Sequence, residues 1–236
     1  MLNNVVVSGG SYAQTLSRGV SILETLANDL RPLGLRELVA ELGLSRSVVY
    51  RLLRTLEAHR LVRVRANGKY ELGPGLFALA RGVGFDLRAL SRPILENAAR
   101  KHNATVILSV VDGNEVVCLV SVEPPESGVR VTHREGRRHE AGRGSSGIAV
   151  LAAMPPQEDE REVVTRSRNV GYSVSSDEME QGVVAASAPL GLPMHDWVGA
   201  VSLLFVQAAA PSPKEAGEAA QQIAHDISAA HHHPAQ

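Results

Sequence analysis

One helical stretch of the sequence carries polar and basic residues at a spacing suited to reading DNA. In "LSRSVVYRLLRTLEAHRLV" (44–62), apolar side chains recur at Val49, Leu52 and Leu56, which marks one buried face of a helix. The other face presents its candidates for base and phosphate contacts at Arg46, Ser47, Tyr50, Arg51 and Arg54. Guanidinium groups bind phosphate and pair bidentately with guanine in the major groove. We therefore predict a DNA-reading face, with an ordinary solvated helix face as the alternative.

The elements around this stretch form a pattern that would position it on DNA. A helix is predicted from residue 16 by apolar steps of three and four, and "RPLG" (31–34) ends it. A short helix follows in "LRELVAEL" (35–42), with Gly43 just past its end. Ser45 then offers its hydroxyl as the N-cap of the third helix. Two strand-like pieces, "LVRVRA" and "KYELG", flank Asn67-Gly68, a strong hairpin signal. This order predicts a winged helix-turn-helix.

The predicted wing and the first helix add further candidates for contacts with the DNA backbone. A tip at Asn67-Gly68 would bring Arg65 and Lys69 within reach of phosphate or the minor groove. Arg18 near the start of the first helix is another phosphate candidate. Each of these positions is a weak signal alone, and together they extend the predicted DNA surface beyond the third helix.

Charge and composition fit this interpretation. Residues 1–74 hold 10 lysines and arginines against 6 acidic residues, a net charge of +4, and the remainder carries −5. Apolar residues make up 44% of the chain, enough for a sizeable core. A single cysteine excludes an internal disulfide and favours a reduced compartment. The N-terminus lacks signal-peptide features, and no apolar stretch is long enough to span a membrane. We expect a cytoplasmic protein that does not enter a membrane.

The rest of the chain predicts a second, α+β domain. A short helix near residues 76–80, a glycine joint at Gly82 and Gly84, and a longer helix ending near His102, with Pro93 inside it, mark the boundary region. Strands are predicted in "TVILSVVDGNEVVCLVSV", "GYSVS", "VVAASAPL" and "VGAVSLLFV", with a possible one in "GVRVTHRE". Helices are predicted in "SGIAVLAAM", in the charged "QEDEREVVTRSRN" and in "KEAGEAAQQIAHDISAA". Paired strands with helices between them predict a mixed sheet flanked by helices.

The sequence resembles the IclR family of bacterial transcriptional regulators over residues 14–230. The resemblance is carried by "LRELVAELGLSRSVVYRLLRTLEAHRLVRV", "NGKYELGPGL" with its G-x-Y-x-L-G tail, "HREGRR", "RGSSGIAVLAAM" and "GYSVSSDEMEQGVVAASAPL". It implies a winged helix-turn-helix at 14–74, a linker helix at 75–84 and a GAF-like effector-binding domain at 85–230. It also implies a repressor or activator of a catabolic or related operon, which binds double-stranded operator DNA as a homodimer or a dimer of dimers.

The same resemblance implies an effector site around "AGRGSSGIA" (141–149). Gly142, Gly144, Ser145 and Ser146 precede a helix, where free N–H groups attract a carboxylate, and Arg143 is a candidate partner. The alternative is a structural turn whose serine caps the helix. The chain departs from the family at Ser175, Ala185 and Leu204, where polar or ionisable groups are common. Cys118, Ser187 and Ser202 would be the polar or soft groups left facing the pocket, so we expect a relatively apolar carboxylate ligand. The alternative is a pocket that no longer binds a ligand.

A catalytic or metal-dependent protein is the rival class. Cys118 lies in an apolar strand without a local histidine, and no P-loop, dinucleotide fingerprint or Gly-x-Ser-x-Gly occurs. The spacing of His133 and His139 is not that of a helical metal site. We therefore predict neither an enzyme nor a metal or cofactor site. The alternative function is a small-molecule-binding or enzymatic GAF-like protein without sequence-specific DNA binding.

Overall fold

The computed structural model describes residues 13–29, 31–80, 85–125, 130–192 and 197–232. These residues form two compact units, the first ending at Phe85 and the second beginning at Asp86. This division falls at the end of the predicted linker. Among the described residues, no helix combines the length and apolar character needed to cross a bilayer.

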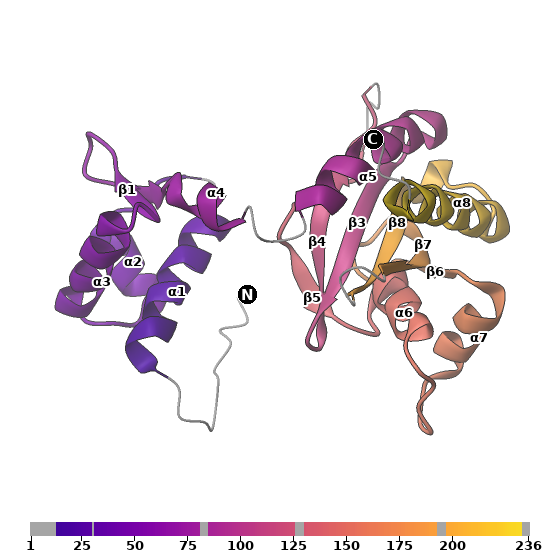
Figure 1. Cartoon of the computed structure of the whole chain (residues 1–236), viewed down its shortest axis with the longest axis horizontal. Coiled ribbons are helices and arrows are strands. Elements are labelled where there is room, and N and C mark those ends of the chain that lie inside the picture. The colour runs from indigo at the N-terminus through magenta and orange to yellow at the C-terminus, as the bar shows by residue number, and fades with distance from the viewer. Residues whose placement is uncertain (1–12, 30, 81–84, 126–129, 193–196, 233–236) are drawn as a thin grey trace. The chain divides into compact units, whose positions relative to one another are not determined.

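The first unit follows the predicted order of helices and strands (Figure 1). Its elements are α1 (Gln14–Asn28), α2 (Leu35–Leu42), α3 (Arg46–Ala58), β1 (Val62–Val64), β2 (Tyr70–Leu72) and α4 (Gly75–Ala80). One apolar core joins all of these elements except α4, and it is formed by Ile22, Leu26, Leu33, Leu38, Val49, Leu52, Leu53, Val62 and Tyr70. The three helices and the hairpin therefore bury the stripes that the sequence pattern predicted, which confirms the winged helix-turn-helix.

The turn between α2 and α3 is fixed by Gly43. This residue has φ +64, a left-handed conformation in which glycine is unstrained, and its N–H donates to the carbonyl of Val39 at 3.1 Å. Ser45 stands at the N-cap of α3 as predicted, but its hydroxyl makes no capping bond and lies 3.2 Å from the hydroxyl of Ser47. The prediction that the Ser45 side chain caps the helix is therefore wrong.

The conformation of the wing explains why both ends of the G-x-Y-x-L-G motif, Gly68 and Gly73, are glycine. Gly68 has φ +75 at the hairpin tip, and Tyr70 is buried in the core. Tyr70 also exchanges backbone hydrogen bonds with Leu33, at 2.7 and 2.9 Å. A side chain at Gly73 would bring its Cβ to 2.3 Å from the carbonyl oxygen of Arg60, so only glycine fits there. The hairpin is therefore held against the end of α3, although its two strands are shorter than predicted.

The second unit is a six-stranded sheet with helices on both faces (Figure 1). Its elements are α5 (Phe85–His102), β3 (Thr105–Asp112), β4 (Glu115–Val122), β5 (Arg138–Glu140), α6 (Gly144–Ala153), α7 (Glu162–Val170), β6 (Ser173–Ser176), β7 (Val183–Leu192), β8 (Trp197–Val206), η2 (Gln207–Ala209) and α8 (Pro213–His232). The strand order is β5-β4-β3-β8-β7-β6, and every pairing is antiparallel. The α+β prediction is confirmed, but the sheet is antiparallel and not mixed.

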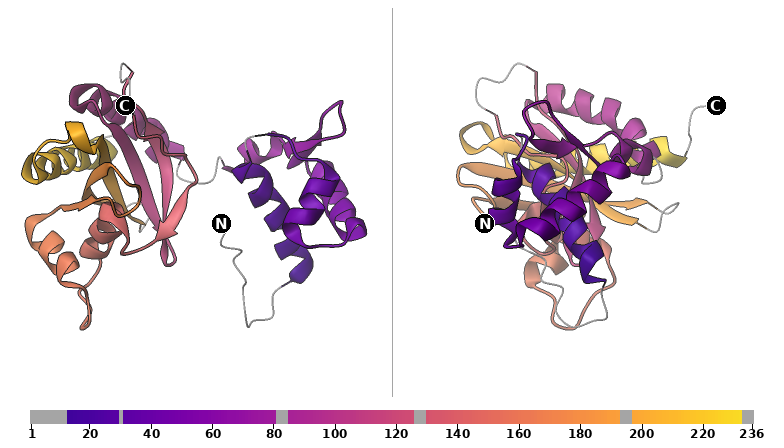
Figure 2. Two further views of the ribbon diagram at one scale, coloured as in Figure 1. Left: turned by 180° about the vertical axis from the view of Figure 1, so that it is seen from behind. Right: turned by 90° about the vertical axis from the view of Figure 1, so that its left-hand side faces the viewer.

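Successive side chains along the strands point alternately to the two helical layers that cover the sheet. Val106, Val201 and Leu203 point to the layer of α5 and α8, which contributes Leu95 and Ile227 to the main core. Their sequence neighbours face α6, which packs on the other side together with α7. Figure 2 shows the same two layers from behind. The face toward α6 is less completely filled with apolar side chains, and a cavity lies there.

Two predicted elements of this unit differ in position. The possible strand in "GVRVTHRE" is absent over its described residues, and the third strand of this region is β5, further along. The backbone of the "GVRVTHRE" segment is held instead by the Thr105 hydroxyl, which donates a hydrogen bond to the carbonyl of Val131. The charged helix begins at Glu162, because the residues before it form turns and extended chain.

Candidate functional site

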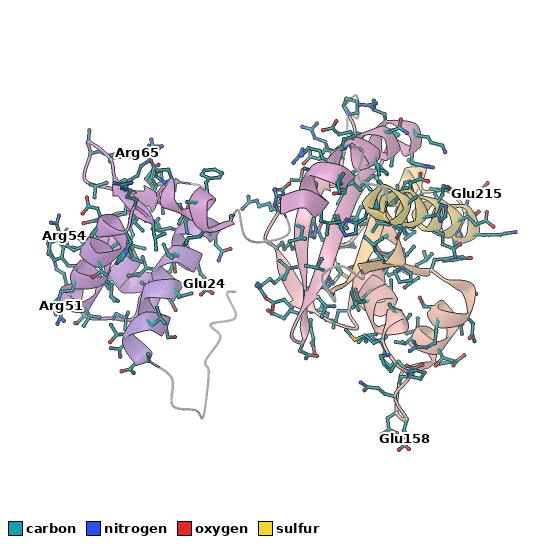
Figure 3. The ribbon with its side chains drawn as sticks, viewed as in Figure 1. Glu24, Arg51, Arg54, Arg65, Glu158 and Glu215 are labelled. Atoms are coloured by element: carbon teal, nitrogen blue, oxygen red, sulfur yellow. The ribbon has the colours of Figure 1, made fainter. Side chains whose placement is uncertain are left out.

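The face of α3 predicted to read DNA is open to solvent along its whole length. The side chains of Ser45, Arg46, Ser47, Tyr50, Arg51 and Arg54 are all exposed, while Val49, Leu52 and Leu53 behind them are buried. Tyr50 is 48% exposed, which leaves an aromatic side chain available to a partner. Figure 3 shows Arg51 and Arg54 directed away from the core of the first unit, with Glu24 on its opposite side.

The cations of this surface differ in how far they are already neutralised. Arg54 lies 3.2 Å from Glu57, one turn along α3. Within the part of the chain that the structure describes, Arg46 and Arg51 make no ion pair. These two guanidinium groups are therefore the ones most available for phosphate or guanine.

Two arginines of the wing form ion pairs with the carboxylate of Glu71. Arg63 and Arg65 both donate through Nε to Glu71, at 2.5 and 2.6 Å. Burial acts to raise the pKa of Glu71, but the hydrogen bonds from the two arginines outweigh it and hold the pKa below its usual range. Glu71 is therefore ionised and cancels part of the wing's charge, a role that the sequence analysis missed because the contact runs across the hairpin.

Two of the remaining DNA candidates, Asn67 and Lys69, have contacts within the first unit. The Asn67 side-chain oxygen accepts a hydrogen bond from the Lys69 N–H at 3.1 Å, which closes the hairpin tip. The Lys69 ammonium lies 3.9 Å from Glu37. Arg18 is partly buried on α1. Asn67 therefore shapes the tip of the wing, whereas Arg65 and Lys69 keep charged groups at its surface.

The second unit contains a cavity of about 50 Å³ between the sheet and the start of α6. Residues from five strands, from α6 and from two connecting segments line it: Ile107, Ser109, His133, Arg137, His139, Gly144, Ser145, Ser146, Ser175, Glu178, Met179, Glu180, Val183, Ala185, Ser202 and Leu204. Its floor lies on the sheet, where Ala185 is opposite both Ser175 and Leu204 and Ile107 is opposite Ser202. The cavity therefore combines an apolar floor with a rim of hydroxyl, imidazole and charged groups.

A chain of buried hydroxyls ties α6 to the sheet beside the cavity. The Ser145 hydroxyl lies 2.7 Å from that of Ser187, which in turn donates to Ser202 at 2.7 Å. The backbone N–H of Ser145 donates to the hydroxyl of Ser175 at 3.1 Å. The first turn of α6 is therefore fixed by serines from three strands. Its own N-cap residue, Arg143, makes no side-chain capping bond, so the alternative of a serine capping its own helix does not describe this turn.

The rim contains one guanidinium group, two imidazoles and two carboxylates. Arg137 Nη1 lies 2.5 Å from Glu180 Oε1. Burial, with a further contribution from Arg137, lowers the pKa of His133 to about 4. Burial and the same arginine lower the pKa of His139, whose Nε2 lies 3.0 Å from the Ser146 hydroxyl. Both imidazoles are therefore neutral near pH 7 and available as hydrogen-bond donors or acceptors.

Comparison with known proteins assigns both units to one family. Residues 15–66 match the IclR helix-turn-helix domain, and residues 82–166 match the bacterial transcriptional regulator IclR C-terminal domain. The chain belongs to the IclR family. The HTH-type transcriptional regulator Rv1719 of Mycobacterium tuberculosis is 32% identical over 160 residues, a match that covers 67% of this chain and 61% of that regulator. The Escherichia coli regulator XynR is 27% identical, over 75% of this chain and 80% of its own.

Solved IclR structures share the fold of this chain. An IclR homolog from Microbacterium hydrocarbonoxydans, complexed with 4-hydroxybenzoate, superposes with a TM-score of 0.80 and 21% identity. The superposition covers 92% of this chain and 99% of that homolog. At this identity the likeness concerns the fold, and the lining of the cavity has to be taken from this chain's own residues.

The cavity of this IclR protein includes most of the residues predicted for the effector site. Those that line it are Gly144, Ser145, Ser146, Ser175, Ala185, Ser202 and Leu204. Ser187 does not line it, because its buried hydroxyl is held between two other serines. Arg143 is exposed and also lies outside the lining, so its pairing with a ligand stays a prediction that the cavity does not support.

Two further predicted residues lie outside the cavity. Gly142 has φ +89, and its carbonyl accepts a hydrogen bond from Arg161 at 2.6 Å, so it shapes the turn before α6. Cys118 is buried in β4, and burial raises the pKa of its thiol to about 12. The sequence prediction missed the ion pair between Arg137 and Glu180, and it considered His133 and His139 only as metal ligands. Among the described residues, no cluster of three histidine, cysteine or acidic side chains could hold a metal.

Proposed function

We propose that this chain is a DNA-binding transcriptional regulator controlled by a small organic acid bound in its second unit. The observation that carries the proposal is the solvent-exposed face of α3, on which two arginines make no ion pair with any described residue. The helix follows a short glycine turn, and the wing comes directly after it. A helix presented in this way fits the major groove of B-DNA. The protein acts by binding and not by catalysis, in the cytoplasm of a bacterium.

The position of each residue on α3 determines which part of the DNA it contacts. Ser47, Tyr50, Arg51 and Arg54 meet base edges and adjacent phosphates, because they share the exposed face of the helix. Ser45 and Arg46 lie at its N-terminal end, where backbone N–H groups also favour phosphate. In the wing, Arg65 and Lys69 contact the DNA backbone and Asn67 fixes the tip between them. Arg18 on α1 is a further phosphate contact.

The regulator binds DNA as a homodimer or as a dimer of dimers. Two helices of the first unit expose large apolar side chains that a soluble monomer would bury: Leu16 (69%) and Val20 (44%) on α1, and Phe77 (80%) and Leu79 (64%) on α4. Contact with the same helices of a second copy would remove these surfaces from water. Such a dimer presents two copies of α3 and fits a palindromic operator.

The effector is a small, relatively apolar organic acid. Ile107, Ala185 and Leu204 provide an apolar floor for a ring or an alkyl chain, while Ser109 and Ser202 offer hydroxyls. The 4-hydroxybenzoate complex of the Microbacterium homolog supports an aromatic acid as one candidate. Benzoates and phenolic acids are therefore the first ligands to test.

DNA binding is tested with the full chain and a labelled duplex from the region upstream of its own gene. Fluorescence anisotropy should show binding that resists excess non-specific DNA, weakened about tenfold or more by Arg51→Ala or Arg54→Ala. Arg166→Ala, which removes an exposed arginine from α7 in the second unit, is the matched control and should bind normally. Failure to bind any duplex at low salt, where electrostatic binding is strongest, would contradict the proposal and favour a ligand-binding protein without sequence-specific DNA recognition.

The effector class is tested by a thermal-shift screen of small carboxylates and phenols. A ligand that binds only the folded state raises the melting temperature by mass action. We expect 4-hydroxybenzoate or a related acid to raise it in the wild type and to raise it less in Ser202→Ala, which loses a hydroxyl of the cavity wall. A screen without any shift would contradict an organic-acid effector while leaving DNA binding intact.

A further inference from the structure

The ion pair between Arg137 and Glu180 stands at the rim of the cavity, and both of its members line the cavity. Resting on the proposed function, we infer that Glu180 occupies the position on Arg137 that the carboxylate of the effector takes. Residues 177–182 then form a cover that is held shut by this pair and released when the effector displaces Glu180. Arg137 is thereby the residue that selects an anionic effector.

The cover is a short loop with closed ends. Glu178, Met179 and Glu180 follow one another along the chain, and all three line the cavity without belonging to a helix or strand. At the base of the loop, the Asp177 carboxylate accepts a hydrogen bond from the Gly182 N–H at 2.6 Å. Because its two ends are tied together, the loop between them can move as one piece.

The inner side of the cover rests on the start of α6. A Cβ built on Gly144 would lie 2.8 Å from the Cγ of Met179, so the methionine fills the space that a side chain at this position would need. Met179 is unbranched and flexible, which suits a side chain that packs on the site in one state and leaves it in another. The cover therefore closes the cavity through one apolar contact and one ion pair.

The wall of the cavity can move in one place. The sheet residues of the wall are fixed by strand pairing, and α6 is fixed by the serine chain. The segment that carries His133 and Arg137 is anchored by β5 and by the hydrogen bond from Thr105 to Val131. Residues 177–182 are the part of the wall that remains free to move.

The charges of the rim identify the group that displaces Glu180. Among the described residues that line the cavity, Arg137 is the one with a guanidinium or ammonium group. The imidazoles of His133 and His139 beside it are neutral. A ligand carboxylate can take its place on Arg137 only by exchange with Glu180. The side chains of the pair are 38% and 39% exposed, and ion pairs this open to water are weak. The exchange therefore costs little, and burial of the ligand's apolar part decides the affinity.

The test uses the full chain with benzoate as the anionic probe and benzamide as its uncharged analogue. Isothermal titration should show that Glu180→Gln binds benzoate about threefold to fivefold more tightly than the wild type, since a weak competitor has been removed. Arg137→Gln should bind it at least about tenfold more weakly, because a charge-assisted hydrogen bond is lost. Glu158→Gln is the matched control: it removes the same charge from an exposed position of the second unit that does not line the cavity, and its benzoate affinity should stay near that of the wild type. Benzamide has no charge for Arg137 to bind, so its affinity should not fall in Arg137→Gln.

Hydrogen exchange gives a readout that needs no ligand. Amides of residues 177–182 should exchange faster in Glu180→Gln and in Arg137→Gln than in the wild type, with Glu158→Gln unchanged. Equal exchange in all four proteins, equal benzoate affinity in Glu180→Gln and Glu158→Gln, or no benzoate binding to any of them would each overturn the inference. Binding of the upstream duplex, measured on the same preparations, separates this result from a failure of the proposed DNA-binding function.

Discussion

The carboxylate of Glu71 on β2 accepts a hydrogen bond from Nε of Arg65 at 2.6 Å and also binds Arg63, so the wing carries less free charge than its sequence indicates. Glu71→Gln should therefore strengthen DNA binding several-fold, because both guanidinium groups become free for phosphate. The plot of log affinity against log salt should steepen by about one to two units. Anisotropy titrations between low and moderate salt measure both quantities.

The control for this change is Glu24→Gln. Glu24 is exposed on α1, on the side of the first unit opposite Arg51 and Arg54, so its removal alters the net charge without touching the wing (Figure 3). If both variants bind equally well, the gain comes from net charge alone. A loss of affinity in Glu71→Gln would instead mean that the carboxylate positions the arginines and does not compete with DNA.

The buried serine chain should matter for stability. Ser187 has no exposed surface and bridges Ser145 and Ser202, so Ser187→Ala leaves two buried hydroxyls without a partner. We expect the free energy of unfolding to fall by about 1–3 kcal/mol. Urea unfolding followed by Trp197 fluorescence measures it, with the exposed Ser176→Ala as control. An unchanged midpoint would show that the chain of hydroxyls contributes nothing to holding α6.

Local sequence signals were sufficient for the first unit. Gly43, the Asn67-Gly68 tip and the apolar spacing of α3 each depend on a few neighbouring residues, and all three lie where the pattern predicted them. What the pattern could not supply was the partner of each charged group. Glu71 reaches Arg63 and Arg65 only after the hairpin has formed, so its effect on the charge of the wing depends on strand register.

The cavity was predictable only in part, for the same reason. The glycines and serines around Ser145 were found because a helix start has a local signature. Arg137 and His133 belong to a segment with little regular structure, which reaches the cavity through β5 and through the bond between Thr105 and Val131. The antiparallel pairing of the sheet is likewise a long-range property. No local spacing distinguishes it from a mixed sheet.

Arg168 on α7 binds the C-terminal end of α6 and the turn that follows it. Its guanidinium group donates to the carbonyl oxygens of Leu151, Ala152 and Met154 and lies 2.7 Å from Glu160. Its side chain is 23% exposed. Arg168→Ala should lower the free energy of unfolding by roughly 2–3 kcal/mol, because several buried acceptors lose a charged donor.

Arg166, which also lies on α7, is the matched control for Arg168. It pairs with Glu162, but the two side chains are 70% and 88% exposed. Arg166→Ala should change the stability by no more than about 0.5 kcal/mol. Chemical denaturation of both variants decides between the two roles, and equal losses would contradict a special contribution from Arg168.

Cys118 should behave as an inert thiol in the folded protein. Its side chain is 2% exposed, and burial, with a contribution from Glu135, raises its pKa to about 12. At pH 8 only about one molecule in ten thousand carries the thiolate that reacts with iodoacetamide. Labelling followed by mass spectrometry should therefore be negligible in buffer and rapid in urea. Fast labelling without denaturant would mean that β4 opens or that the thiol lies nearer to solvent.

Acid should weaken the second unit through His133. The pKa of this group is about 4 in the folded protein, against about 6.5 for an unhindered histidine, because it is buried beside Arg137, with His139 and Glu180 also facing it. Between these two values the unfolded chain binds the proton and the folded chain does not, so the free energy of unfolding falls as the pH drops from 6.5 toward 4. His133→Gln should reduce the stability lost between pH 7 and pH 5 by about 1–2 kcal/mol. Urea titrations at the two pH values measure this difference, and the exposed His59→Gln, in the first unit, should leave it unchanged.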